Sequence, residues 1–105
     1  MSSPTKRSLA LLREAGFDVG IVEKWNQWAK VRQDLFGFID LVAMKPGHGI
    51  YGIQTTSRAN MAARRKKIQA SDLALTWKAS GGVILLHGWQ KNRKTGRWEV
   101  LVEKL

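Results

Sequence analysis

The chain has no cysteine and only two prolines among its 105 residues. Without cysteine there is no disulfide framework, no thiolate metal site and no cysteine nucleophile. No apolar run approaches the roughly 20 residues that a membrane-spanning helix needs. The first four residues, Met1-Ser2-Ser3-Pro4, do not open a signal peptide. We therefore expect a protein of a reducing compartment, the cytoplasm of a bacterial, archaeal or phage-infected cell, with no membrane partner.

Acidic residues are also scarce, with 8 Asp and Glu against 18 Lys and Arg and a formal net charge of +10. A hydrophobic content of 44% with five Trp is too high for a disordered basic tail. A chain of this length has room for one domain around one core, so we expect residues 1–105 to form a single domain. Its positive field indicates a polyanionic partner.

Residue patterns predict a mixed α/β domain. Ser3-Pro4 is a helix start, and Gly81-Gly82 follows the second predicted helix. The near-continuous apolar run 36–44 is typical of a strand covered on both faces. Residues 23–33, polar with two Trp, form either a long loop or a poorly regular hairpin. The predicted order α-β-β-β-α-β-β comprises a helix over 4–15, strands over 17–22, 36–44 and 50–56, a helix over 59–79, and strands over 83–89 and 97–103.

Asp40 is the unusual residue of the apolar run 36–44. Burying a carboxylate costs several kcal/mol unless it is paired, hydrogen-bonded or bound to a metal. Gln54 and Thr56, two residues apart on the next strand, share a face of that strand. If the strands form a hairpin around the turn 46–49, Asp40 and Gln54 offer hard oxygen ligands of the kind that Mg²⁺ prefers. Without a metal, Asp40 could instead be an Asp whose carboxylate accepts hydrogen bonds from backbone amides. Gln54 and Thr56 could likewise be a polar pair on a solvated strand face.

This arrangement resembles the PD-(D/E)XK nuclease superfamily, with its restriction-endonuclease-like mixed sheet flanked by helices. The most specific blocks are Asp34-Leu35-Phe36-Gly37-Phe38-Ile39-Asp40-Leu41-Val42-Ala43 and Ile53-Gln54-Thr55-Thr56-Ser57. In size and element order the chain is most similar to archaeal-type Holliday junction resolvases and related small phage nucleases. The resemblance implies a homodimeric endonuclease that hydrolyses phosphodiester bonds of branched DNA with Mg²⁺, for which Mn²⁺ can substitute.

The resemblance also assigns roles to residues. Asp40 matches the metal-binding Asp of the family, and Gln54 stands where the family has an acidic ligand. Thr56 stands at the position of the catalytic lysine. Glu14 matches the first-helix Glu that completes the resolvase metal site, although a surface Glu beside an Arg explains it equally from the residue pattern. Asp34 is a candidate supporting residue or, alternatively, caps a turn, and Ser57 is a second candidate supporting residue.

The departures at Gln54 and Thr56 remove charge from the motif. The positive charge that the lysine would supply could come from a basic residue of the predicted helix 59–79. With Met61, Ile68 and Leu75 on the buried face, Arg64 and Arg65 lie within about 60° of that face, whereas Lys66 and Lys67 point away. Either arginine is then a candidate. The alternative is a solvated face that contacts DNA phosphates.

The other basic residues are spread along the chain, which suits the tracking of phosphates more than base reading. Trp25 and Trp28 are candidates for stacking on unpaired bases, or alternatively lids over the core. We assign no role to His48 or His87. The expected DNA-binding set is Lys30, Arg32, Arg58, Arg64, Arg65, Lys66 and Lys67.

Two further hypotheses stay open. Because Gln54 and Thr56 carry no charge, the chain could be a catalytically inactive relative that binds DNA without a metal near Asp40. Charge alone also allows an RNA-binding or inhibitory accessory protein.

Overall fold

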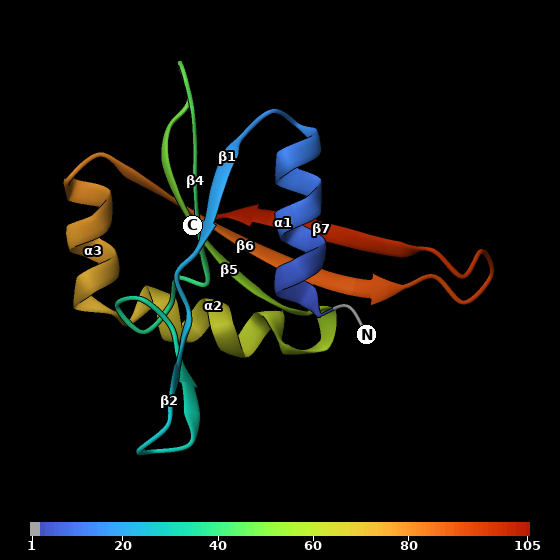
Figure 1. The fold of residues 1–105 in the computed structure, drawn as a ribbon, viewed down its shortest axis with the longest axis horizontal. Helices are drawn as coiled ribbons and strands as arrows, with labels where there is room; N and C mark the ends of the chain where they lie inside the picture. The colour runs from blue at the N-terminus through green and yellow to red at the C-terminus, as the bar shows by residue number, and fades with distance from the viewer. Residues whose placement is uncertain (1–2) are drawn as a thin grey trace.

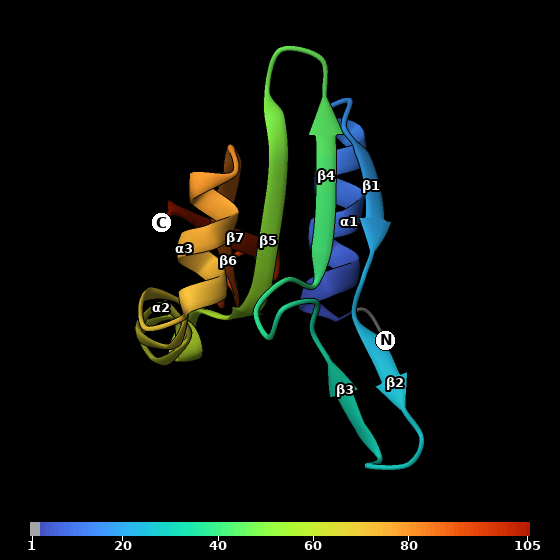
Figure 2. The same cartoon turned by 90° about the vertical axis from the view of Figure 1, so that its left-hand side faces the viewer.

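The computed structural model describes residues 3–105, which form a mixed five-stranded sheet with helices on both faces (Figures 1 and 2). The strand order is β1-β4-β5-β6-β7. Strands β5 and β6 are parallel, and the other neighbouring pairs are antiparallel. The predicted mixed α/β class is therefore confirmed. The sheet strands are β1 (Asp18–Ile21), β4 (Leu41–Lys45), β5 (Gly49–Ser57), β6 (Gly82–Lys91) and β7 (Trp98–Lys104).

Three α-helices and a short 3-10 helix accompany the sheet. They are α1 (Pro4–Glu14), η1 (Arg58–Asn60), α2 (Met61–Gln69) and α3 (Asp72–Ala79). Residues 23–33, for which the sequence allowed a long loop or a hairpin, form a hairpin. Its strands, β2 (Lys24–Asn26) and β3 (Val31–Gln33), pair with each other and not with the main sheet. Figure 2 shows it projecting beyond the sheet. No helix within residues 3–105 is both long and apolar enough to span a membrane.

The core has two layers because side chains alternate along each strand. On one face, Leu12 of α1 packs with Leu41, Ala43 and Ile53. On the other face, the buried cluster is Phe38, Ile39, Ile68, Ala74 and Ile84, against which Trp77 of α3 packs. Covering by helices on both faces explains why the central strands are continuous apolar runs in the sequence.

The predicted helix 59–79 is wrong as a single element. Helix α2 ends at Gln69, and Ser71 caps a new helix, its Oγ accepting from the amide of Ala74 at 3.3 Å. Met61 and Ile68 are buried as the heptad spacing predicts, but Leu75 is 63% exposed. The break changes the helix direction, so the spacing of seven residues does not carry across it.

The predicted strand 36–44 is also too long, because β4 begins only at Leu41. Residues 35–39 form a tight turn, with positive φ at Phe36 (56°) and Gly37 (82°). Phe38 and Ile39 are nevertheless almost fully buried. The apolar run thus reflects burial of a turn followed by a strand, and Asp40 lies between the two.

Candidate functional site

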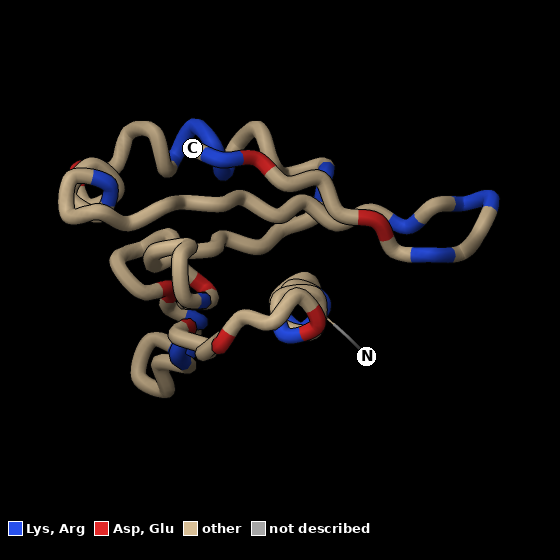
Figure 3. The backbone as a smooth tube through the Cα atoms, turned by 90° about the horizontal axis from the view of Figure 1, so that it is seen from above, with Lys and Arg blue, Asp and Glu red and all other residues tan. Residues whose placement is uncertain are grey.

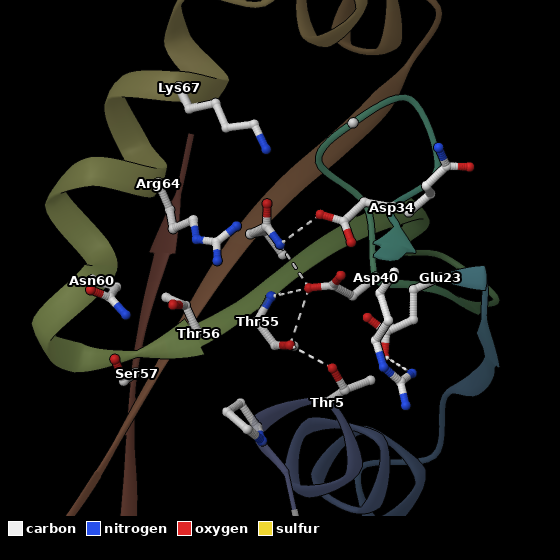
Figure 4. Close-up of a pocket in the computed structure, with 15 residues that line it drawn as sticks. Thr5, Glu23, Asp34, Asp40, Thr55, Thr56, Ser57, Asn60, Arg64 and Lys67 are labelled. Atoms are coloured by element: carbon white, nitrogen blue, oxygen red, sulfur yellow. Dashed lines mark hydrogen bonds and ion pairs between the residues drawn. The ribbon is translucent and has the colours of Figure 1, made fainter. Parts of the chain in front are cut away.

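An open cleft of about 880 Å³ lies between the start of α1, the β2–β3 hairpin, the end of β5 and helix α2 (Figure 4). Its lining is almost entirely polar or charged. Acidic side chains enter from the hairpin side, together with Arg32 of β3, and the other basic side chains enter from α2. The cleft therefore holds charges of both signs and is built from segments far apart in the sequence.

Asp40 is the centre of the acidic side and is only 3% exposed. Its Oδ2 accepts hydrogen bonds from Gln54 Nε2 at 2.7 Å, from the amide of Thr55 at 2.8 Å and from Thr55 Oγ1 at 3.1 Å. Burial, followed by the hydrogen bond and charge of neighbouring Asp34, raises the pKa of Asp40 to about 7. The carboxyl is thus held in a fixed orientation in surroundings that disfavour its negative charge.

Three carboxylates converge at this point. Glu23, Asp34 and Asp40 each offer an oxygen within 4.8 Å of the others. Glu23 is positioned by the sheet, because the amide of Val22 donates to the carbonyl of Asp40 at 2.9 Å. Asp34 follows β3 directly and precedes the tight turn that leads to Asp40. The hairpin between them brings both ends of residues 23–34 to the same place.

Gln54 completes the acidic side as a neutral residue that is 2% exposed. Its Nε2 donates to Asp40 and, at 3.4 Å, to Asp34 Oδ2. Its Oε1 is buried and has no hydrogen-bond partner among residues 3–105. Because a buried acceptor without a partner is costly, this oxygen is the atom of the site that most needs a ligand.

This donor set fits a hard divalent cation such as Mg²⁺. Carboxylate and amide oxygens are its preferred ligands, and a positive charge would relieve the repulsion that raises the pKa of Asp40. Gln54 presents its Nε2 to Asp34 and Asp40, so its Oε1 would reach the same cation after the amide turns over. Of the three predicted ligands, Asp40 and Gln54 lie at this point, and Glu23 and Asp34 are acidic groups that the prediction did not assign to the metal.

The basic side of the cleft comes from α2. Arg64 and Lys67 both line the cleft, and Figure 4 shows their side chains reaching from the helix toward the acidic group. They lie three residues apart and therefore on one face of the helix. Thr56, 5% exposed, lines the wall near Arg64. A cationic side chain thus lies beside Thr56 in the cleft wall.

The structure adds a lysine to the cleft and removes an arginine from it. Arg64 and Arg65 are half-buried and Lys66 and Lys67 are exposed, as the helix geometry predicts. Lys67 nevertheless lines the cleft, whereas it was expected to point away. Arg65 instead forms a two-pronged ion pair with Glu103 of β7, with Nε 2.7 Å from Oε2.

Glu14 is not at this site. It is exposed at the last turn of α1, whereas Thr5, at the first turn, lines the cleft. Nine residues along a helix separate the two by roughly 13 Å. The third acid beside Asp34 and Asp40 is Glu23, two residues after β1, and no sequence pattern linked β1 to the strand that follows Asp40.

The remaining predictions divide between the cleft and the surface. The predicted residues that line the cleft together are Asp34, Asp40, Gln54, Thr56, Ser57, Arg32, Arg64 and Lys67. The predicted residues that do not line it are Lys30, Arg58, Arg65 and Lys66. The sequence reasoning missed Thr5, whose hydroxyl lies 2.8 Å from that of Thr55, and Asn60 at the start of α2.

Comparison with known proteins adds no assignment to this geometry. No protein-family model, curated protein or solved structure matches the chain. The function must therefore be argued from the site.

Proposed function

We propose that the protein is a Mg²⁺-dependent endonuclease that hydrolyses phosphodiester bonds of DNA, with branched DNA such as four-way junctions as its substrate. The proposal includes a restriction-endonuclease-like fold of the PD-(D/E)XK type and a homodimer that cuts two strands. The observation that carries it is the pairing, in one cleft, of three carboxylates and an unpartnered Gln54 Oε1 with two cations of α2.

Glu23, Asp34, Asp40 and the Oε1 of Gln54 would hold the metal. When bound, Mg²⁺ or Mn²⁺ polarises a phosphoryl oxygen and lowers the pKa of a bound water. The hydrogen bonds of Asp40 keep its carboxyl from rotating, and those of Gln54 fix which end of its amide is left free. The protein thus supplies a pre-oriented set of oxygen ligands.

The cations opposite the carboxylates bind the phosphate itself. Arg64 and Lys67 reach into the cleft from one helix face, and Arg32 lies at the hairpin side, 3.3 Å from Glu23. A guanidinium can hold two phosphate oxygens, whereas an ammonium acts as a point charge. In this proposal Arg64 supplies the positive charge that Thr56 lacks, and Lys67 neutralises the charge of the scissile phosphate.

Basic residues outside the cleft extend the phosphate-binding surface. Figure 3 shows Lys and Arg along the length of the molecule, including a group on the turn that projects between β6 and β7. That group comprises Lys91, Arg93, Lys94 and Arg97. A distribution of this kind favours binding to backbone phosphates over base reading.

A catalytically inactive DNA-binding protein is the second candidate. It is favoured by the neutral residues at Gln54 and Thr56 and by the three hydrogen bonds that already satisfy Asp40 Oδ2. It predicts salt-dependent DNA binding without metal binding. Titration calorimetry with Mn²⁺ separates the two, because a metal site loses its heat signal in Asp40→Asn.

The cleavage test uses a four-way junction, a blunt duplex and a single strand, each with Mg²⁺, Mn²⁺ or EDTA. We expect metal-dependent cleavage of the junction, at least a hundredfold weaker in Asp40→Asn. Asp18→Asn, on the exposed strand β1 outside the cleft, is the matched control and should retain activity. Absence of cleavage by the wild type, or cleavage undiminished in Asp40→Asn, would refute the proposal.

A further inference from the structure

The β2–β3 hairpin carries the most exposed aromatic side chain of the described residues. Trp28, in its turn, is 92% exposed, and Trp25, on β2, is 60% exposed. Exposed aromatic side chains that share one groove, as these two do, are typical of an interaction surface. The alternative that these two Trp are lids over the core is therefore wrong.

The turn that carries Trp28 is held in one conformation by side-chain hydrogen bonds. Asn26 Oδ1 accepts hydrogen bonds from the amides of Trp28 and Ala29, both at 3.0 Å. Lys30 closes the turn in the left-handed region, at φ 54°. Because the side chain of Asn26 holds the backbone, Trp28 is displayed at a defined place on the hairpin.

A shallow groove of about 370 Å³ runs along this hairpin. Its lining includes both indoles together with Lys24, Asn26, Gln27 and Gln33. Gln33 also lines the acidic cleft, so groove and cleft share this residue. A nucleotide strand that runs along the hairpin past Gln33 would reach both.

The chemistry of the groove fits a nucleotide strand. Lys24 lines the groove, and Lys30 and Arg32 are further exposed basic residues of the hairpin. The two acids at the ends of the hairpin, Glu23 and Asp34, line the cleft instead. Indoles with cations beside them suit bases that stack and phosphates that follow the backbone. Paired bases are already stacked on each other, so only unpaired bases offer a free face.

We propose that this hairpin groove binds unpaired nucleotides of DNA next to the cleft, by stacking of bases on Trp28 and Trp25. The inference rests on the proposed function and narrows its substrate to DNA with unpaired bases beside the cutting site. It gives a physical reason for a preference for branched over continuous duplex DNA.

The test measures DNA binding in EDTA, so that it is independent of cleavage. Fluorescein-labelled duplex with a ten-nucleotide overhang is compared with blunt duplex at one salt concentration, by anisotropy. We expect Trp28→Ala to weaken overhang binding by roughly tenfold and blunt-duplex binding by less than twofold. Trp98→Ala is the control, because Trp98 is a 45% exposed indole on β7, covered by Arg7.

Two conservative variants separate stacking from general apolar contact. Trp28→Phe should retain most of the overhang preference, because it keeps an aromatic face, whereas Trp28→Leu should lose it. The inference would be overturned if Trp28→Ala lost equal affinity for overhang and blunt duplex, or lost none for either. Junction cleavage by the wild type would be unaffected by that result. If the wild type binds neither DNA, the proposed function itself fails.

Discussion

Gln54 donates its amide N–H to Asp40 across 2.7 Å, and its own carbonyl oxygen is buried without a hydrogen-bond partner among residues 3–105. The two residues meet because β4 and β5 pair directly, so that the residue before β4 lies beside the strand that carries Gln54. The amide therefore supports the carboxylate. Under the proposed function its oxygen would also be a metal ligand.

Replacing each of the two candidate glutamates by glutamine, one at a time, tests which of them binds the metal. Glu23→Gln should weaken Mn²⁺ binding at least tenfold, because it removes one of three converging carboxylates. Glu14→Gln removes the same charge from the exposed far end of α1 and should leave binding within twofold. Titration calorimetry measures both. The reverse order of effects would restore Glu14 as the ligand.

Removing the charge of Asp40 should stabilise the protein in the absence of metal. The raised pKa of Asp40, about 7 against an ordinary 3.8, means that the folded state binds the proton more tightly than the unfolded state. Its contribution to stability therefore falls as pH rises between these values, by up to about 4 kcal/mol. Denaturant unfolding in EDTA should show Asp40→Asn more stable than the wild type at pH 8.

The same measurement at pH 5 supplies the control, because the folded wild type is then protonated at Asp40. The advantage of Asp40→Asn should shrink there. Adding Mn²⁺ at pH 8 should stabilise the wild type by about 2–3 kcal/mol at a hundredfold excess over the dissociation constant, and leave the variant unchanged. A variant that is less stable than the wild type at pH 8 in EDTA would contradict the electrostatic account.

His87 gives a pH dependence of the opposite sign. Burial lowers its pKa from 6.5 to about 4, and its Nδ1 lies 2.8 Å from Ser8 Oγ, which accepts from Trp89 Nε1. The neutral imidazole of His87 thus belongs to a buried chain of hydrogen bonds with Ser8 and Trp89. The unfolded state takes up a proton that the folded state resists, so stability is lost as pH falls from 6.5 to 4, by up to about 3 kcal/mol.

The His87 effect is measured in the Asp40→Asn background, where the opposing slope of Asp40 is absent. Unfolding free energies from pH 7 to 4 should fall in that background. The added change His87→Asn should flatten the curve. An equally steep curve after that change would assign the acid sensitivity to other groups.

The two neighbouring lysines of α2 offer a matched pair for the basic side of the cleft. Lys67→Ala should lower the rate of junction cleavage by about tenfold to a hundredfold, because its ammonium faces the carboxylates. Lys66→Ala removes the same charge from the exposed surface and should change the rate less than threefold. Equal losses would indicate general phosphate attraction instead of a role in the cleft.

The sheet and the Asp40–Gln54 pair were predictable because both follow from local patterns. Continuous apolar runs identified the buried strands, and a short turn between two runs predicted their hairpin. Asp40 stood out because a carboxylate in such a run needs a partner. The structure supplies that partner as Gln54.

The other features of the fold and the site depended on contacts between segments far apart in the sequence. Ser71 begins a new helix where the apolar spacing seemed continuous, so the predicted helix 59–79 is two helices. Lys67 lines the cleft although its helix position points away from the buried face, because the cleft does not lie over that face alone. Glu23 reaches Asp40 only because β1 pairs with β4, a contact that the sequence around Glu23 does not encode. The resemblance to the resolvases therefore placed the acid on the wrong element.

The central claim is that Glu23, Asp34, Asp40 and Gln54 form one metal site. It is tested most directly by a crystal structure with Mn²⁺, located by its anomalous scattering. The account predicts one strong peak between the three carboxylates, at about 2.0–2.4 Å from their oxygens and from Gln54 Oε1. The absence of a peak there at saturating Mn²⁺, or a peak held by other residues, would contradict it.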